Sequence, residues 1–269
     1  MFDVATVGDN CIDRYGPPLD FSTVGGNAVN VAIQLASLGG RTAYFGAVGD
    51  DADGRRVVSA LRSRNVDVDH VITRRMVTAF TNIEFDAGGE RVFAFEEFGA
   101  CQGYAPTAPE VAVLSRLRHV HLGWLDDSGA VKRTLAAAGV TVSQDLSVNA
   151  AARDLQPDGL SIAFLSMDGS RAEAEALLRR TLDAGVRSAV VMMGHRGSMA
   201  SDGRTWAFAD AQPVEPVDTT GAGDTFIAAF LTAQMAGRDL QASLEAARLA
   251  AAVTCLHYGG FPQEPAPRG

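Results

Sequence analysis

A glycine-rich turn that carries a carboxylate is the strongest chemical signal in the sequence. It lies within residues 218–226, which read DTTGAGDTF. Apolar residues recur at helical spacing after Asp224, so Gly221, Ala222 and Gly223 are expected at the N-terminus of a helix. The first amide N–H groups of a helix have no partner within it, and the helix dipole adds about half a positive charge there. Two glycines would leave room for a bulky anion to approach this backbone.

Phosphoryl transfer to a hydroxyl group is the chemistry that this turn could perform. Backbone amides would neutralise charge on the transferred group, and the Asp224 carboxylate would accept the proton of the attacking hydroxyl. An aspartate in the first turn of a capped helix does not need such a role, because the dipole alone favours it. Residues 221–224 by themselves leave both interpretations open.

Length and composition narrow the class of protein. The chain has 269 residues, with 23 Lys and Arg against 32 Asp and Glu and a formal charge of −9. This length predicts one α/β or barrel domain. Nucleic acids and anionic membranes are bound through clustered cations, so the acidic balance argues against both partners. Three distant cysteines predict neither a disulfide framework nor a metal site. The sequence shows no membrane-span pattern and no signal-peptide pattern. A cytoplasmic enzyme is therefore expected.

Strands and helices alternate along most of the chain. Short apolar runs that end at turn residues predict buried strands, and apolar residues at helical spacing predict helices. The expected strands cover residues 2–7, 42–48, 119–122, 140–145 and 187–193; the expected helices cover 27–38, 54–64, 128–138, 171–184, 221–236 and 240–258. This alternation predicts parallel strands in a sheet that helices cover on both faces.

Residues 78–98 break this alternation. They predict two strands around a turn at 86–89, and such a hairpin commonly projects from the main sheet as a lid or a dimer contact. An added pair of edge strands is the simpler alternative. A second hairpin-like pair is expected at 197–208, and the proline-rich residues 261–269 are expected to be a frayed tail.

Two further motifs accompany the glycine-rich turn. GGNAVN, at 25–30, opens the first predicted helix, and GAVGDDADG, at 46–54, leads into the second. Together with DTTGAGDTF, in this order and spacing, they resemble the ribokinase (PfkB) family of sugar kinases over nearly the whole length. The resemblance implies a ribokinase-like three-layer α/β sandwich with a mostly parallel central sheet. It also implies a single domain, 1–269, with a small β lid from about 12–22 and 76–99.

The resemblance assigns roles to individual residues. It makes Asp224 the catalytic base, and Gly221, Ala222 and Gly223 the anion hole for the γ-phosphate. The sugar is expected to contact polar and glycine positions near the first strand and in the lid, namely Asp9, Asn10, Asp13, Gly25, Gly26, Asn27, Arg91 and Glu96. Carboxylate and amide side chains offer the paired acceptors and donors that a polyol needs.

The nucleotide is expected beside the last two helices. The family's Gly-x-x-Gly turn matches residues 194–197, where an ordinary β-turn with His195 facing solvent is the alternative. The helix around 248–252, together with Gly259, would flank the adenine. The expected nucleotide-binding residues are Gly194, Gly197, Thr219, Arg248 and Ala251.

Mg-ATP is the expected phosphoryl donor, because the triphosphate requires charge neutralisation. The family's Asn-x-x-Glu motif, which organises water around Mg²⁺, is missing here. Asp168 and Glu173 are the candidates to replace it, although a helix N-terminus explains such residues without a metal. Asp218 and Thr220 match positions that hold a monovalent cation such as K⁺ in many members.

The alternating His119 and His121 could face one way on their predicted strand. No third ligand accompanies them, so they predict a structural role rather than a metal site.

The expected reaction is ATP-dependent phosphorylation of the primary (6-) hydroxyl of a ketosamine or ketose, with a fructosamine favoured. The ammonium group of an amino-acid-bearing sugar would favour acidic residues near the lid, namely Glu96, Glu97, Asp126 or Asp127. The lid edge could also pair in a homodimer.

Alternative functions remain open. The same chemistry could act on fructose, ribose, 2-keto-3-deoxygluconate or a nucleoside, and a non-catalytic sugar or nucleotide sensor could keep the same fold. The sequence lacks GxxxxGK[ST], which excludes a P-loop kinase. No GxGxxG follows the first strand, which disfavours a nicotinamide oxidoreductase.

Overall fold

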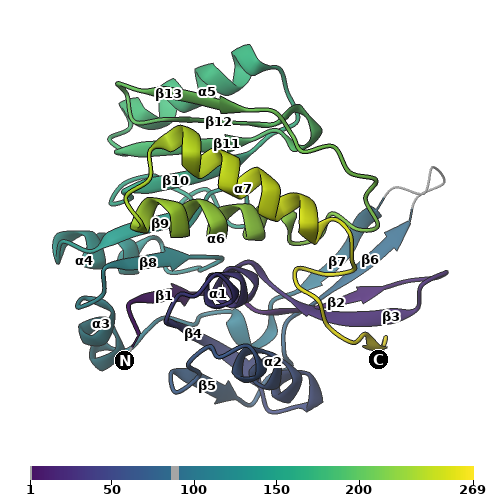
Figure 1. Cartoon of the computed structure of the whole chain (residues 1–269). Coiled ribbons are helices and arrows are strands. Elements are labelled where there is room, and N and C mark those ends of the chain that lie inside the picture. Colours follow the sequence, from purple (N-terminus) through teal and green to yellow (C-terminus); the bar gives the residue numbers. More distant parts are fainter. Residues whose placement is uncertain (1, 86–90) are drawn as a thin grey trace.

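The chain forms a large, mostly parallel sheet and a small sheet in the computed structural model (Figure 1). The structure describes residues 2–85 and 91–269, and of Arg91 only the backbone. The predicted turn at 86–89 therefore lies outside the described residues.

The large sheet has the strand order β13-β12-β11-β10-β9-β8-β1-β4-β5 in the described part of the chain. Its strands are β1 (Val4–Val7), β4 (Thr42–Gly49), β5 (Val71–Arg74), β8 (His119–Leu122), β9 (Thr141–Asp145), β10 (Ile162–Ser166), β11 (Ser188–Met192), β12 (Ser198–Ser201) and β13 (Trp206–Ala209). Neighbours from β5 to β11 pair in parallel, and β12 and β13 add an antiparallel hairpin. The carboxyl ends of the parallel strands therefore share one edge.

Helices cover both faces of this sheet. One face carries α1 (Asn27–Ser37), α2 (Ala52–Ser63), α6 (Ala222–Met235) and α7 (Leu240–Thr254), and the other carries α3 (Ala108–Leu114), α4 (Ala130–Ala137) and α5 (Arg171–Asp183). Alternate strand residues separate the two cores: Val4 packs with α1 and α6, whereas Ala5 packs with α3 and α4. The predicted three-layer fold is confirmed. No helix in the described ranges is long and apolar enough to cross a bilayer.

Several elements were not predicted, among them β5, β10, β14 (Ala266–Pro267) and α3, and all four are short. Strand β5 has four residues, and α3 has seven. A Thr107–Glu110 capping box fixes the start of α3, but seven residues are too few to reveal a helical apolar period.

The small sheet has the order β14-β3-β2-β6-β7 among the described strands. It contains β2 (Cys11–Tyr15), β3 (Phe21–Gly25), β6 (Phe80–Phe85), β7 (Arg91–Glu97) and β14 (Ala266–Pro267). It extends away from the large sheet beside the C-terminal end of α7 (Figure 1). The hairpin β6–β7, expected from residues 78–98, belongs to this sheet. Two short 3-10 helices, η1 (Gly99–Cys101) and η2 (Gly194–Arg196), complete the described elements.

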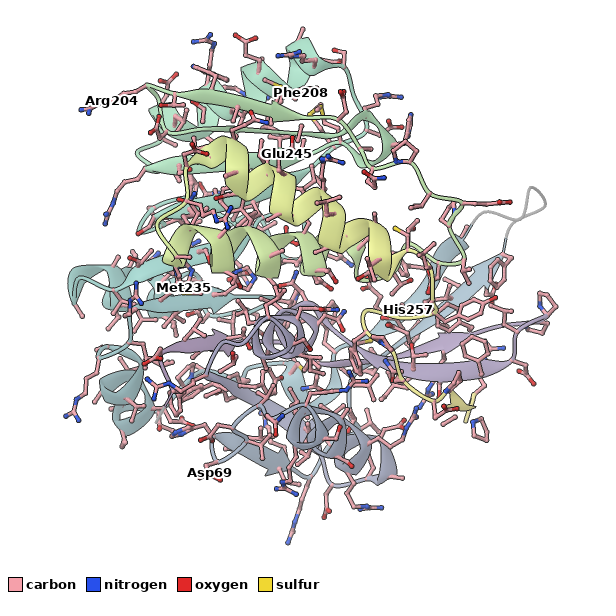
Figure 2. The ribbon with its side chains drawn as sticks, viewed as in Figure 1. Asp69, Arg204, Phe208, Met235, Glu245 and His257 are labelled. Carbon is pink, nitrogen blue, oxygen red and sulfur yellow. The ribbon has the colours of Figure 1, made fainter. Side chains whose placement is uncertain are left out.

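The prediction of a frayed C-terminal tail is wrong. The segment after α7, which includes the labelled His257, leads from the helical layer to the small sheet (Figure 2). Phe261 is buried against α1 and α2. The Gln263 side chain accepts the N–H of Val24 and donates to its carbonyl, both at 2.8 Å. These long-range contacts give the proline-rich tail a fixed place that local composition does not show.

Candidate active site

Two cavities meet at the turn that opens α6. The first, about 650 Å³ in volume, is lined by residues of the small sheet together with residues of α1, β9 and α6; we call it the acidic pocket, and its lining includes Asp9, Asn27, Glu96, Asp145 and Asp224. The second, about 500 Å³, lies against α6 and α7, and we call it the helix pocket. Thr219 lines both cavities. Two ligands could therefore meet at this turn.

The turn has the geometry that its glycines predicted. Gly221 is the N-cap of α6 with a φ of 72°, in the left-handed region, and a Cβ there would lie 2.2 Å from the Cα of Gly260. Only glycine fits both constraints. Asp224 follows in the first turn of the helix, while the N–H of Ala222 donates to the carbonyl of Thr219 at 3.2 Å.

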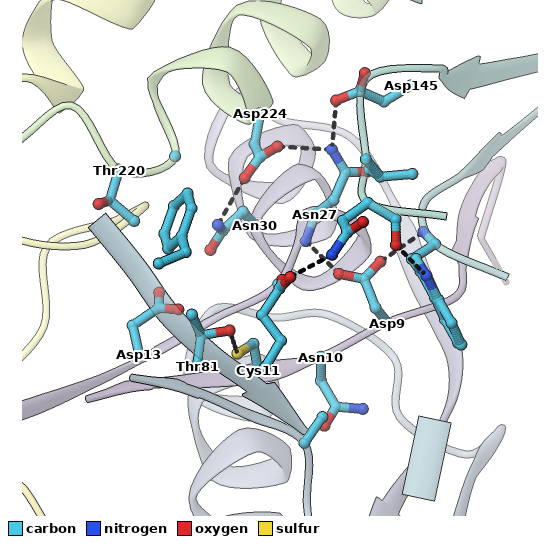
Figure 3. A pocket seen from close by; sticks show the side chains of 18 of the residues that line it. Asp9, Asn10, Cys11, Asp13, Asn27, Asn30, Thr81, Asp145, Thr220 and Asp224 are labelled. Atoms are coloured by element: carbon cyan, nitrogen blue, oxygen red, sulfur yellow. Dashed lines mark hydrogen bonds between the residues drawn. The ribbon is translucent and has the colours of Figure 1, made fainter. Parts of the chain in front are cut away.

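Asp224 faces the acidic pocket between two amide side chains (Figure 3). Its carboxylate accepts hydrogen bonds of 2.7 Å from the Nδ2 atoms of Asn27 and Asn30. Burial raises the pKa of Asp224 to about 8, and the negative charges of Asp145 and Asp9 act in the same direction, whereas the two amides oppose the shift. A carboxyl group with a pKa near neutral pH is well suited to accept a proton from a hydroxyl.

Asn27 connects three carboxylates. Its backbone N–H donates to Asp9 Oδ2 at 2.7 Å, and its Nδ2 donates to Asp145 Oδ2 at 3.0 Å as well as to Asp224. Its Oδ1 lies 3.3 Å from Nε2 of His121. The sequence predicted a sugar ligand here, and the structure places the residue at the centre of the acidic pocket (Figure 3).

Asp9 lines the acidic pocket, although its carboxylate already caps α1. It accepts the N–H groups of Asn27, Ala28 and Trp124, and burial raises its pKa. The N-cap of α1, Gly26, has a φ of 98° and no side chain to do this capping. Asp9 therefore connects the start of α1 to the backbone of Trp124 and also lines the cavity.

Asn10 and Asp13 also line the acidic pocket. Asn10 donates from Nδ2 to the Tyr44 hydroxyl and the Ala47 carbonyl, whereas its buried Oδ1 has no hydrogen-bond partner among the described residues. Such a buried acceptor could receive a substrate hydroxyl. Asp13 lies beside Gly25, where a Cβ would come 2.2 Å from Asp13 Oδ2.

Asp145 and Asn30 are pocket residues that the sequence reasoning missed. Asp145 is the last residue of β9, and burial raises its pKa. A pattern in the sequence could have indicated each of these two residues. Asp145 ends a predicted parallel strand, where ligands usually bind, and Asn30 lies three residues after Asn27 on the same helix face.

The acidic residues predicted near the lid divide into two groups. Glu96 and Glu97 line the acidic pocket; Glu96 is hydrogen-bonded to Asn149, and Glu97 accepts the N–H of Gly99 at 2.9 Å. Asp126 and Asp127 do not line it. Asp126 accepts the N–H of Gly103, and Asp127 accepts N–H groups at the start of α4. The Arg91 side chain lies outside the described residues.

The charged side chains that line the acidic pocket in the described part of the chain are all acidic. Among the described residues, its lining has no Lys or Arg and holds the carboxyl groups of Asp9, Asp13, Glu96, Glu97, Asp145 and Asp224. A cationic ligand would be attracted to this cavity, whereas an anionic ligand would be repelled.

The helix pocket brings together the residues predicted to contact the nucleotide. Its lining includes Gly194, Gly197, Thr219, Arg248 and Ala251, together with His195, which is exposed. Apolar walls come from Met192, Val214 and Phe226, and Arg248 is held by Glu245 and Gln212 at 2.5 and 2.6 Å. Gly259, predicted beside the adenine, instead donates its N–H to Asp218 at 2.9 Å.

The predicted metal-binding residues have protein partners. Asp218 accepts the Tyr15 hydroxyl at 2.6 Å and the Thr220 N–H at 2.9 Å. Asp168 is ion-paired with Arg196 at 2.9 Å, and Glu173 forms a capping box with Ser170 at the start of α5. Asp168 and Glu173 line neither cavity. Within the described ranges, no group of three His, Cys, Asp or Glu side chains is arranged to hold a metal.

Comparison with known proteins gives consistent matches. The model of the pfkB family carbohydrate kinases matches residues 4–115 and 159–267. Fructoselysine 6-kinase of Escherichia coli is 32% identical over 264 residues, covering 97% of this chain and 100% of that protein. Fructosamine kinase FrlD of Bacillus subtilis is 29% identical and covers 95% and 91%.

A solved structure supports the fold. Ribokinase of Arabidopsis thaliana, complexed with ribose and ATP, superimposes with a TM-score of 0.84 at 23% identity, covering 96% of this chain and 94% of that one. The family model, the full-length relatives and the shared architecture agree, and we conclude that the chain belongs to the pfkB family of carbohydrate kinases and is an ATP-dependent sugar kinase.

Proposed function

We propose that the chain transfers the γ-phosphoryl group of Mg-ATP to the primary (6-) hydroxyl of a ketosamine, with a fructosamine of fructoselysine type as the favoured substrate. The observation that carries this proposal is the shared turn, because Thr219 lines both cavities and Asp224 faces the acidic pocket. The sugar would lie in the acidic pocket and the nucleotide in the helix pocket. The hydroxyl and the γ-phosphate would then meet at the N-terminus of α6.

Asp224 would act as the general base. Its carboxylate accepts the hydroxyl proton while the oxygen attacks phosphorus, and the bond to the leaving ADP oxygen breaks. Gly221, Ala222 and Gly223 would stabilise the transferred group through the helix dipole and their backbone N–H groups, that of Ala222 after it leaves the Thr219 carbonyl. Asn27 and Asn30 hold the Asp224 carboxylate in place from below.

Mg²⁺ would neutralise charge on the triphosphate. The described side chains offer no ready cluster of three ligands, so the phosphates and water would hold most of its coordination sphere. Asp168 and Glu173 could assist through water only after leaving Arg196 and Ser170. A K⁺ ion at Asp218 and Thr220 belongs to the proposal on the family resemblance alone.

The preference for a ketosamine rests on the charge of the acidic pocket. A fructosamine derived from an amino acid carries a protonated amine, which Glu96 and Glu97 could pair with at the lid side of the cavity. The relatives named fructoselysine 6-kinase and fructosamine kinase support the same substrate class. A phosphorylated sugar, in contrast, would meet no cation in the described lining.

A coupled assay of ADP release tests the proposal. The purified chain is incubated with Mg-ATP and, separately, fructoselysine, other fructosamines, fructose, ribose, 2-keto-3-deoxygluconate and a nucleoside. We expect the highest kcat/KM for a fructosamine. A neutral sugar with the highest value would overturn the ketosamine assignment, and no turnover of any acceptor would favour a sugar or nucleotide sensor.

A homodimer through the lid is also part of the proposal. Strand β7 is an edge of the small sheet in the described chain, and Phe93 and Phe95 on it are 67% and 50% exposed. An exposed apolar edge favours pairing with a second copy. Sedimentation velocity should detect a dimer that Phe95→Lys converts to a monomer; a monomeric parent chain would refute this part.

A further inference from the structure

A row of buried polar side chains leads from the large sheet to the acidic pocket. His119 and His121 lie on β8, and Ser143 lies beside them on β9, in register with His121. The Ser143 Oγ is 2.8 Å from His119 Nε2 and 2.9 Å from His121 Nδ1. His121 Nε2 then reaches Asn27 Oδ1 at 3.3 Å. All three residues are buried.

The hydrogen bonds of Asn27 set the direction of this row. Its Nδ2 has two hydrogens, and they point to Asp145 and Asp224. Its Oδ1 is therefore turned toward His121, and an oxygen there requires a donor. His121 must carry its hydrogen on Nε2, so its Nδ1 is an acceptor for the Ser143 hydroxyl. Ser143 in turn accepts from Nε2–H of His119.

Both imidazoles are neutral in this arrangement. Burial lowers the pKa of His119 to about 4 and that of His121 to about 3, and the neighbouring His119 ring also disfavours a charge on His121. A neutral ring has one donor and one acceptor nitrogen, which is what the row requires. The order of donors and acceptors therefore stays the same across the pH range in which kinases are assayed.

We propose that His121, with its tautomer fixed by Ser143 and His119, is a positioning residue that keeps both N–H groups of Asn27 directed at Asp145 and Asp224. The proposal rests on the proposed function in one respect, since it takes Asp224 as the base. His121 itself does not line the acidic pocket. It acts through Asn27 alone.

Without the donor at His121, the Asn27 amide can rotate by half a turn. Its Oδ1 would then face Asp145 and Asp224, and the ionised form of Asp224 would lose a hydrogen bond and gain a repulsive dipole. The other groups that face Asp224 do not compensate. Asn30 already donates to it. The remaining charged side chains of the lining are the carboxyls of Asp9, Asp13, Asp145, Glu96 and Glu97, and Asp218 is held by Tyr15 nearby.

The test compares three variants of the full chain in the presence of Mg-ATP and the best acceptor found. His121→Phe keeps the ring shape but removes the donor; His121→Gln keeps an N–H donor. Val120→Ala is the matched control, because Val120 lies between the two histidines and packs on the opposite face of the sheet. Its core cavity lowers stability without touching the row.

We expect His121→Phe to lower kcat about tenfold and to move the acid limb of the kcat/KM profile upward by about one pH unit, with the KM for ATP within about twofold. His121→Gln should recover most of the loss. Val120→Ala should keep the parent pH profile. A His121→Phe profile that matches Val120→Ala would overturn the proposal, and so would failure of His121→Gln to improve on it.

A second measurement does not depend on activity. In protein labelled with ¹⁵N at the histidine rings, NMR should show His121 as the Nε2–H tautomer and neither ring titrating between pH 5 and 9. A His121 ring protonated on Nδ1, or one that gains a charge in that range, would contradict the assignment. If Asp224→Asn retains turnover, the proposed base fails, whereas the tautomer result still decides the orientation of Asn27.

Discussion

Asn27 and Asp224 are 197 positions apart in the chain, yet the Asn27 amide donates a 2.7 Å hydrogen bond to the Asp224 carboxylate. The two residues belong to the first turns of α1 and α6, which pack in the same core. The position of the Asp224 carboxylate therefore depends on the packing of these two helices. It does not depend on the glycine-rich turn alone.

Replacing Asp224 with Asn should lower kcat on the order of a hundredfold or more, because the proposed general base is lost. The KM for ATP should change little, since the helix pocket is unaltered. ADP release is the measurement. Asp239→Asn is the control, because Asp239 caps α7 away from the acidic pocket and asparagine caps a helix equally well. Near-parent turnover in Asp224→Asn would refute the mechanism.

The pH dependence of catalysis should follow Asp224. A base must be ionised to accept a proton, and this carboxyl has a pKa of about 8. We expect kcat/KM to rise about tenfold per pH unit below that value and to level off above it. Steady-state kinetics from pH 6 to 9.5 with saturating Mg²⁺ would show this, and a flat profile across the range would exclude Asp224 as the titrating base.

The same group should affect stability in the opposite direction. The pKa of Asp224 is 3.8 in the unfolded reference and about 8 in the folded chain. Between these values the folded state holds a proton that the unfolded state has lost, so the free energy of unfolding falls as pH rises. Asp224→Asn removes this pH-dependent contribution to the free energy of unfolding. The Tm of the variant minus that of the parent should increase from pH 4 to 8; a constant difference would contradict the shift.

Removing the lid carboxylates should discriminate between substrates. The double variant Glu96→Gln, Glu97→Gln keeps the size of both side chains and removes their charge from the acidic pocket. We expect the KM for a cationic fructosamine to increase about tenfold, which corresponds to about 1.4 kcal/mol, with little change for fructose. Asp126→Gln in the same assay serves as the comparison outside the pocket. Equal effects on both sugars would argue against an ammonium site.

Phe261 should be a large contributor to stability despite its place near the C-terminus. It is 2% exposed and packs in the core between α1 and α2. Phe261→Ala should lower the free energy of unfolding by about 3–5 kcal/mol. Leu256→Ala, at a position that is 53% exposed, should change it by less than about 0.5 kcal/mol. Urea denaturation measures both, and similar midpoints for the two variants would show that the tail is not packed.

The sequence predicted the parts of the site that local patterns determine. The N-terminus of α6 and the position of Asp224 follow from two glycines and an apolar stripe within a few residues. Asn27 was predicted as a sugar ligand, but its three carboxylate partners come from the turn after β1, from β9 and from α6, which no local pattern connects. The tail was predicted to fray because its composition is proline-rich, whereas Gln263 is fixed by Val24, 239 positions away. Contacts of this kind arise only from the complete fold.

The C-terminal strand has a consequence for how the protein is made. β14 forms one edge of the small sheet by pairing with β3, and β3 leads through Gly25 into the acidic pocket. Along the chain, β3 precedes its outer partner by more than 200 residues, since Ser22 and Ala266 are 244 positions apart. A nascent chain can therefore assemble much of the large sheet while its acidic pocket is still unfinished. A chain interrupted before β14 would leave β3, which leads to Gly26 of the acidic pocket, without its outer partner strand.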